Sequence, residues 1–298
     1  MEFELFVTRL VQGIVNGAVY GFLALALVCT YRGSKAINLA QGEMAMLCTF
    51  FAFTLTNHGF PVLLAIGGGV LFGAALGGVV ERTLIRPLGR DAEYPVLIVC
   101  IGLFLGINAL AGVIWGGDPV AFPALVPDAP DDFISILGAR LRYQQLVILG
   151  ALALTVTALY AVFRFTRLGL AMRATASNPD SAVLVGVRVS RMNSLGWVLA
   201  CAVGAILGPL IAPSTTLSTA LFFTFIIYGV AAATLGGFDS PIGAVVAGLI
   251  IGVTENLVAS YVGFIGDSLK MTVALVILLI VLMVKPTGLF GSREVERV

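Results

Sequence analysis

The sequence has little charge for its size. Only 11% of its 298 residues are charged and 59% are apolar, against about 25% charged and about 45–50% apolar in soluble domains. A soluble fold must cover its surface with solvated groups, so this composition and the mean hydropathy of +1.05 exclude a water-soluble globule. The 17 basic residues are balanced by 16 acidic ones, which leaves no excess positive charge for binding nucleic acid. The sequence therefore predicts a protein of the lipid bilayer.

The sequence also lacks the residues that most enzymes use. It contains one histidine, His58, so several histidines cannot form a metal site or proton relay. No lysine follows a glycine, which excludes the phosphate-binding loop G-x-x-x-x-G-K-[ST]. We therefore expect neither enzymatic activity nor a cofactor in this chain. The cysteines lie inside apolar runs without C-x-x-C spacing, as small core residues do: Cys29, Cys48, Cys100 and Cys201.

The first residues lack the features of a cleaved signal peptide. Glu2 and Glu4 stand where such a peptide carries positive charge, and no A-x-A cleavage pattern follows. We expect the first apolar segment to stay in the protein as a membrane span.

Long apolar segments fill most of the chain. A spanning helix needs about 20 mostly apolar residues, because it rises about 1.5 Å per residue across a core of about 30 Å. The second and seventh candidates are the weakest, so we expect about 8 to 10 spans. The predicted fold is an all-α polytopic transmembrane bundle that forms a single domain over residues 1–298. The nine candidate spans are 11–31, 36–57, 61–80, 94–114, 145–163, 192–212, 219–235, 241–261 and 269–284.

Basic residues are unevenly divided between the two sides of the predicted membrane. If the N-terminus is outside, only Arg9, Arg140, Arg142 and Lys270 lie on the outer side. Basic residues are retained on the cytoplasmic side, so this distribution predicts a multi-pass protein with a cytoplasmic C-terminus. The 13 inner basic residues are Arg32, Lys35, Arg82, Arg86, Arg90, Arg164, Arg167, Arg173, Arg188, Arg191, Lys285, Arg293 and Arg297.

Glycines recur at four-residue spacing, which lets transmembrane helices approach closely. With 35 glycines, single pairs are weak signals, but together the stripes predict one compact bundle. The stripes are Gly13, Gly17 and Gly21; Gly69, Gly73 and Gly77; Gly102 and Gly106; Gly204 and Gly208; and Gly248 and Gly252.

The longest inner loop, about 165–191, contains a signal for a short helix. Its apolar residues 182–185 are framed by residues typical of helix ends: Asn178, Pro179, Asp180 and Gly186. Two interpretations are open on this pattern alone. The helix either docks a cytoplasmic partner or lies on anionic lipid, anchored by Arg173 and Arg188.

Two acidic residues lie within predicted spans, where such groups are costly and normally face a cavity or the bundle interior. Glu43 is in the inner third of the second segment, and Glu255 is in the outer half of the eighth. Apart from Lys270, at the outer end of the last span, no Lys or Arg lies within the spans to pair with them. These acids either line a path for a small polar solute or form helix–helix hydrogen bonds that fix the fold. Further polar candidates for the path are Asn16, Asn38, Gln41, Asn108 and Asn256.

The outer loop, about 115–143, is rich in proline and aspartate. Its second half, FISILGARLRYQQ, alternates apolar and other residues around Gly138-Ala139, which predicts a small hairpin. The loop either receives an extracytoplasmic partner or covers the bundle as a solvated lid.

Several runs of the sequence resemble the branched-chain amino acid ABC transporter permeases, in that family's order. The resemblance covers nearly the whole chain. It implies an inner-membrane permease subunit of a bacterial leucine/isoleucine/valine-type importer, with ATP bound by partner subunits. The runs are GIVNGAVYGFLALALVCTYRGSKAINLAQGEMAML, ERTLIRPL, GLAMRATASNPDSAVLVGVRVSRM, ATLGGFDSPIGAVVAGLIIGVTENLV and KPTGLFGSREVERV.

The resemblance also implies partners and a mechanism. The partners would be a second homologous permease, two cytoplasmic ATPases and a periplasmic solute-binding protein. ATP-driven closure of the ATPases would push on the inner loop and open the path alternately to each side. This favours the docking interpretation, with these coupling residues: Arg173, Ala174, Asp180, Ala182, Gly186 and Arg188.

One position departs from the family pattern. Where the family usually has INFAHGE, residues 37–43 read INLAQGE, so Gln41 replaces a histidine. Gln41 preserves hydrogen bonding but does not titrate near neutral pH.

The solute class is open in principle, because the same architecture also serves urea, amides and other amino acids. The resemblance is closest to the branched-chain amino acid permeases, so an aliphatic amino acid is the expected solute. An ion-coupled secondary transporter would need an ion site made from broken helices. A structural scaffold would not need Glu43 or Glu255.

Overall fold

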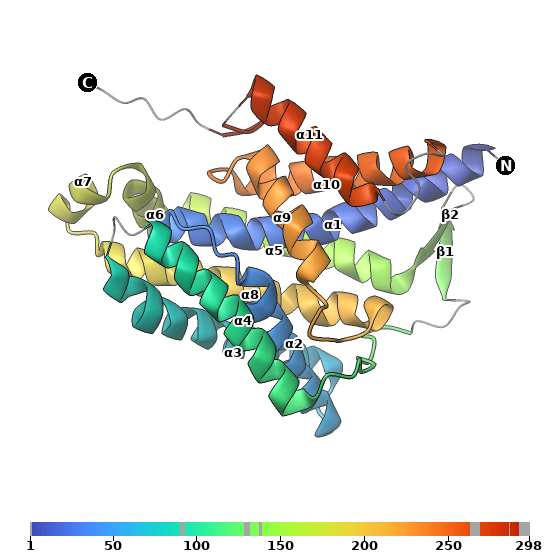
Figure 1. Cartoon of the computed structure of the whole chain (residues 1–298), viewed down its shortest axis with the longest axis horizontal. Helices are drawn as coiled ribbons and strands as arrows, with labels where there is room; N and C mark the ends of the chain where they lie inside the picture. Colours follow the sequence, from blue (N-terminus) through green and yellow to red (C-terminus); the bar gives the residue numbers. More distant parts are fainter. Residues whose placement is uncertain are drawn as a thin grey trace.

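The computed structural model describes residues 2–89, 93–127, 132–136, 139–262, 269–285 and 287–291. It confirms the all-α prediction (Figure 1). The helices are α1 (Glu2–Ser34), α2 (Gln41–Asn57), α3 (Val62–Val80), α4 (Glu93–Trp115), α5 (Tyr143–Phe165), α6 (Arg167–Ser177), α7 (Pro179–Leu184), α8 (Val189–Thr215), α9 (Phe223–Gly236), α10 (Pro241–Tyr261) and α11 (Lys270–Val284). Two strands, β1 (Phe133–Ile136) and β2 (Ala139–Arg142), form a hairpin.

Each predicted span coincides with a helix, but not all of these helices are long. Within the described residues, six helices have the length and hydropathy to cross a bilayer: α1, α3 with the turns that follow it, α4, α5, α8 and α10. Helices α9 and α11 are apolar but shorter. The predicted starts of the second and seventh spans, at 36 and 219, are wrong, because α2 begins at Gln41 and α9 at Phe223.

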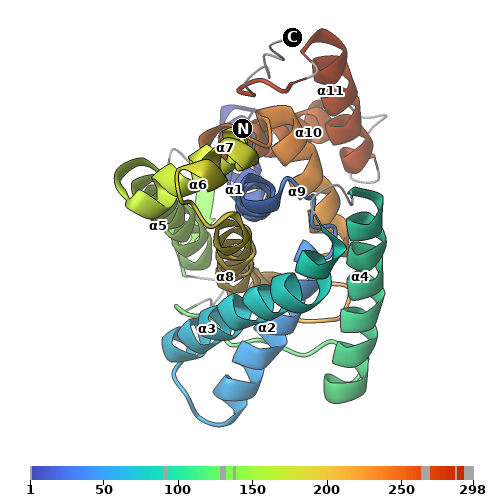
Figure 2. The same ribbon diagram turned by 90° about the vertical axis from the view of Figure 1, so that its left-hand side faces the viewer.

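Helix α1 runs through the centre of the bundle. Figure 2 shows it nearly end-on, surrounded by α5, α8, α9 and α10, and it packs against all four. Every residue from 17 to 30 is buried. A helix that is apolar on every side belongs in such an interior position.

Glycine stripes set the closest helix approach. A Cβ added at Gly13 would lie 2.7 Å from the Val253 Cα, and one added at Gly17 would lie 2.6 Å from the Leu249 Cα, so α1 and α10 meet backbone to backbone. A Cβ added at Gly102 or Gly106 on α4 would have no atom of another element within 4 Å among the described residues. That stripe therefore makes no helix contact within the described chain.

The two ends of the bundle carry different features. The N-terminal part of α1 lies near the β1–β2 hairpin at one end, and α6 and α7 lie at the other (Figure 1). We call them the hairpin end and the α7 end. The hairpin prediction is confirmed, with Phe133 opposite Arg142; the turn residues 137–138 lie outside the described residues. The four cysteines are buried and unpaired, as predicted.

The predicted helix in the long loop is also confirmed. It is α7, whose first N–H groups are capped by the Asn178 side chain, which accepts from the Ser181 backbone N–H at 2.9 Å. Gly186 follows the helix with φ of +83°, a conformation that glycine adopts without strain. Helix α6, which precedes α7, was not predicted, because its apolar residues are interrupted by Arg167, Gly169, Arg173 and Thr175 and form no long apolar run.

Candidate functional site

Helix α2 begins deep inside the bundle. The Asn38 side chain accepts from the Ala40 backbone N–H at 3.1 Å, a local turn that delays the start of the helix. Gln41 then donates through Nε2 to the Ala200 carbonyl of α8 at 2.9 Å and accepts from Asn38 Nδ2 at 3.1 Å. Ala200 lies about 17 Å along α8 from its first residue, at about 1.5 Å per residue. The first turn of α2 is therefore near the middle of the bundle, and Gln41 fixes it to α8.

Helix α9 begins beside it. The segment 216–222 between α8 and α9 is not helical, and Thr216 has φ of +67° where α8 ends. A Cβ added at Gly42, the second residue of α2, would lie 3.0 Å from the Cβ of Phe222, the residue that precedes α9. The N-terminal ends of two short helices thus lie next to each other inside the bundle.

Glu43 lies at this junction. Its side chain is 2% exposed. Asn108 of α4 donates through Nδ2 to Glu43 Oε2 at 3.1 Å and to the Thr219 carbonyl at 2.9 Å. One amide therefore ties α2, α4 and the segment before α9 together.

The electrostatics of the junction suit negative charge. The first N–H groups of a helix have no intrahelical acceptor, and the N-terminus carries about half a positive charge. Within the described residues, no Lys or Arg forms an ion pair with Glu43. The helix ends and the Asn108 amide therefore provide the favourable partners of the Glu43 carboxyl.

Glu255 belongs to a different cluster. Tyr20 of α1 donates to Glu255 Oε1 at 2.8 Å and stacks on Tyr228 with ring centroids 4.3 Å apart. In the described part of the chain, Glu255 Oε2 and Asn256 Nδ2 are buried without a hydrogen-bond partner. No hydrogen bond among the described residues joins this cluster to Glu43. Asn16, half-buried on α1, has no side-chain hydrogen bond to either cluster.

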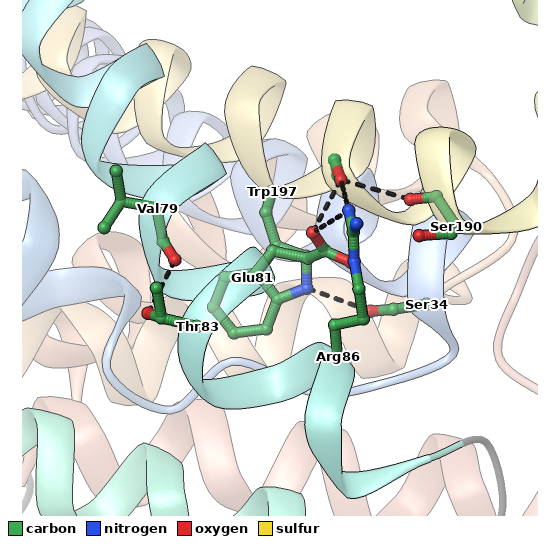
Figure 3. A network of polar contacts seen from close by, with 8 residues as sticks. Ser34, Val79, Glu81, Thr83, Arg86, Ser190 and Trp197 are labelled. Carbon is green, nitrogen blue, oxygen red and sulfur yellow. Dashed lines mark hydrogen bonds and ion pairs between the residues drawn. The ribbon is translucent and has the colours of Figure 1, made fainter.

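A third buried acid, Glu81, lies at the α7 end and was missed by the sequence analysis (Figure 3). Its carboxylate, 2% exposed, accepts from Arg86 Nη2 at 2.9 Å and from Ser194 Oγ of α8 at 2.6 Å. Residues five apart do not face each other on an α-helix. Here a π-helical turn over Glu81–Ile85 brings the two side chains together.

The predicted coupling loop is divided between buried and exposed residues. On α7, Ala182 is 2% exposed, whereas Leu184 is 88% exposed and the neighbouring Val183 and Val185 are 50% and 77% exposed. Asp180 lies in the first turn of α7 and Arg188 immediately before α8; both are exposed. Arg173 and Ala174 lie on α6 and are half-buried. The Arg173 side chain lines a pocket, so it is not part of the exposed surface that α7 presents.

The family model and the relatives in sequence agree with each other. A family model described as the branched-chain amino acid transport system permease component matches residues 9–284. The high-affinity branched-chain amino acid permease protein LivH of Salmonella typhimurium is 29% identical, over 100% of this chain and 99% of that protein. BraD of Pseudomonas aeruginosa, with the same description, is 28% identical over 98% of both. Among solved structures, a chain of PsaBC from Streptococcus pneumoniae in complex with Fab aligns over 93% of this chain and 91% of that chain, at 16% identity and a TM-score of 0.49.

Proposed function

Because this chain belongs to the branched-chain amino acid transport permease family, we propose that a branched-chain amino acid crosses the membrane beside Glu43. The chain is a multi-pass membrane protein and, as a member of that family, a non-catalytic permease subunit of an ABC importer. ATP is used by the partner ATPases of such importers.

The observation that carries the proposal is the meeting of the α2 and α9 N-termini around a buried carboxyl group. An amino acid carries an ammonium and a carboxylate group. The Glu43 carboxyl offers a partner for the ammonium, and the N–H groups at helix N-termini bind carboxylates. Broken helices with such ends are a recurring way of building solute sites at the membrane midplane.

Glu43 is covered in this conformation, so transport needs the junction to open. Helix α4 supplies the covering Asn108, and its apolar window is 17% buried, the lowest share among the six long helices. We propose that α4 moves away from α2 to admit the solute. Gln41, bonded to α8, would hold α2 in place during that movement.

The test is uptake of labelled leucine by the complex reconstituted with its partner subunits. Glu43→Gln keeps the side-chain shape and removes the charge, and we expect uptake to fall at least about tenfold. Glu255→Gln is the matched control: the same change at another buried glutamate, which we assign to helix–helix hydrogen bonding with Tyr20. Wild-type uptake by the Glu43→Gln protein would show that the solute path does not depend on Glu43. Equal loss of uptake in both variants would show that Glu43 has a structural role only.

We also propose an orientation, with the α7 end in the cytoplasm and the hairpin end outside. Arg32, Arg86 and Arg164 lie where α1, α3 and α5 end, on the side of α6 and α7. This is the distribution that the positive-inside rule favours. The solute-binding protein would then meet the hairpin end, and the chain would pair with a second, homologous permease and two ATPases in a bacterial inner membrane.

Helix α7 is the proposed contact with an ATPase. Its cap and the buried Ala182 hold it against the bundle, while Leu184 and its neighbours are exposed as an apolar patch that water disfavours. Leu184→Asp should abolish co-purification of the ATPase and solute-stimulated ATP hydrolysis, because it places a charge in the apolar contact. At 88% exposure the change should leave the thermal stability of the chain unaltered. Leu184→Ile is the control that keeps the patch apolar; full ATPase binding by the Leu184→Asp protein would exclude α7 as the docking element.

A further inference from the structure

A second feature of the α7 end is a small pocket between α1, α5, α6 and the start of α10. It has a volume of about 230 Å³, and three arginines line it: Arg32, Arg164 and Arg173. We propose that this pocket binds the phosphate headgroup of an anionic phospholipid at the membrane surface.

The pocket has an excess of positive charge. In the described part of the chain, none of the three arginines lies within 4 Å of a carboxylate oxygen. The acid in the lining, Asp239, faces Lys35 at 3.5 Å, so its charge is shared with a further cation. A guanidinium group presents several donors that match phosphate oxygens, and like charges held together need an anion between them.

Two of the arginines show features that prepare the pocket for an anion. The Arg32 guanidinium lies 4.8 Å from the ring centroid of Phe163, a cation–π contact that fixes its position. The Arg173 Nε is buried and has no acceptor among the described residues. A buried N–H without a partner is costly, so an acceptor in the pocket would be favoured.

The start of α10 adds to the attraction for an anion. Ser240, Pro241 and Ile242 are part of the lining, and the Ser240 hydroxyl caps the helix by accepting from the Gly243 N–H at 3.0 Å. The positive end of this 21-residue helix therefore points to the same pocket as the arginines.

The apolar part of the lining favours a lipid over a free anion. Tyr160 and Val156 lie about one and two turns before Arg164 on α5, which places them deeper in the bilayer. Tyr160 is 45% exposed and Ile242 is 49% exposed, so both offer surface to an acyl chain below the headgroup. A soluble phosphate would leave these side chains unused.

The experiment is a lipid titration of the full chain in detergent. We would measure bound phospholipid by native mass spectrometry and the unfolding temperature as phosphatidylglycerol is added, with phosphatidylcholine and inorganic phosphate as separate probes. We expect phosphatidylglycerol to be retained and to raise the unfolding temperature, and the other two to have no effect. In Arg164→Gln/Arg173→Gln, phosphatidylglycerol affinity should fall about thirtyfold, which corresponds to about 2 kcal/mol at about 1.4 kcal/mol per factor of ten.

The matched control is Arg82→Gln/Arg167→Gln, which removes two exposed arginines near the same end without touching the pocket. If both double variants lose phosphatidylglycerol equally, the attraction is general surface charge and the pocket is not the site. If inorganic phosphate alone stabilises the chain as well as the lipid does, the ligand is a soluble anion and the lipid assignment is wrong. If adding the partner ATPases instead of lipid stabilises the wild type and not the pocket variant, the occupant is a protein group.

Discussion

The ion pair at the end of α3 makes an asymmetric prediction about stability. The Glu81 side chain is 2% exposed, whereas the Arg86 side chain is 40% exposed. Replacing either residue by alanine breaks the same 2.9 Å contact. The two changes nevertheless leave different groups behind, so they should lower the free energy of unfolding by different amounts.

The magnitudes follow from what each variant leaves without a partner. Arg86→Ala leaves a buried carboxylate with Ser194 as its remaining donor, and breaking a buried pair in this way costs about 3–5 kcal/mol. For Arg86→Ala we expect a loss of about 3 kcal/mol in the free energy of unfolding, at the lower end of this range, because Ser194 still donates to the Glu81 carboxylate. Glu81→Ala leaves an arginine that water can reach, so we expect about 1 kcal/mol. The double variant leaves no buried charge and should also cost about 1 kcal/mol, well below the sum of the two single changes.

The assay is unfolding of the purified chain in detergent, followed by tryptophan fluorescence, for the two single variants and the double variant. Trp197 donates to Ser34 at 3.2 Å close to this network, so its emission, recorded together with that of Trp115, follows the unfolding (Figure 3). Arg82→Ala, an exposed arginine one residue from Glu81, is the control and should change stability by less than about 0.5 kcal/mol. A Glu81→Ala protein as unstable as Arg86→Ala, or additive single changes, would refute the reasoning.

Three further predictions concern the bundle. Gly17→Val should cost about 3 kcal/mol or prevent folding because its Cβ meets the α10 backbone, whereas Gly102→Val, with open space around it, should leave the unfolding temperature unchanged. Tyr20→Phe should lower the free energy of unfolding by about 1–3 kcal/mol because it removes the 2.8 Å hydrogen bond that Tyr20 donates to the buried Glu255 carboxyl, and adding Glu255→Leu should restore most of that loss in the same unfolding assay. Gln41→His should fold at neutral pH and lose stability as the pH falls through about 6.5, because the protonated ring cannot accept the hydrogen bond that Gln41 accepts now; a pH-independent unfolding temperature would contradict this.

The features that the sequence predicted correctly depend on neighbours close in the chain. Apolar runs located the helices, and the four-residue spacing of Gly13, Gly17 and Gly21 identified the face of α1 that contacts α10. The cap of α7 was recognised from Asn178 and Gly186, because a capping side chain bonds to a backbone group three residues away. Such signals can be recognised in the sequence without knowledge of the tertiary structure.

Other features depend on contacts between distant residues and left no pattern. A hydropathy window cannot locate the start of α2, because residues 36–40 are nearly as apolar as the helix and Asn38 alone turns the chain. The pairing of Glu81 with Arg86 follows from a π-helical turn that changes which residues face each other. The pocket arginines come from α1, α5 and α6, which only the fold brings together.

The two acids within the predicted spans, Glu43 and Glu255, show why the sequence left their roles open. Both lie in apolar helices without a basic residue next to them in the sequence, so the sequence pattern does not distinguish their roles. The structure separates them by their partners: Tyr20, which bonds Glu255, belongs to the buried central helix, whereas Asn108, which bonds Glu43, belongs to the helix with the least buried window. A group held by the rigid centre of a bundle keeps its surroundings, and a group covered by a peripheral helix can change them. This difference in the burial of the covering helix is our reason for assigning the solute path to Glu43 and the structural hydrogen bond to Glu255.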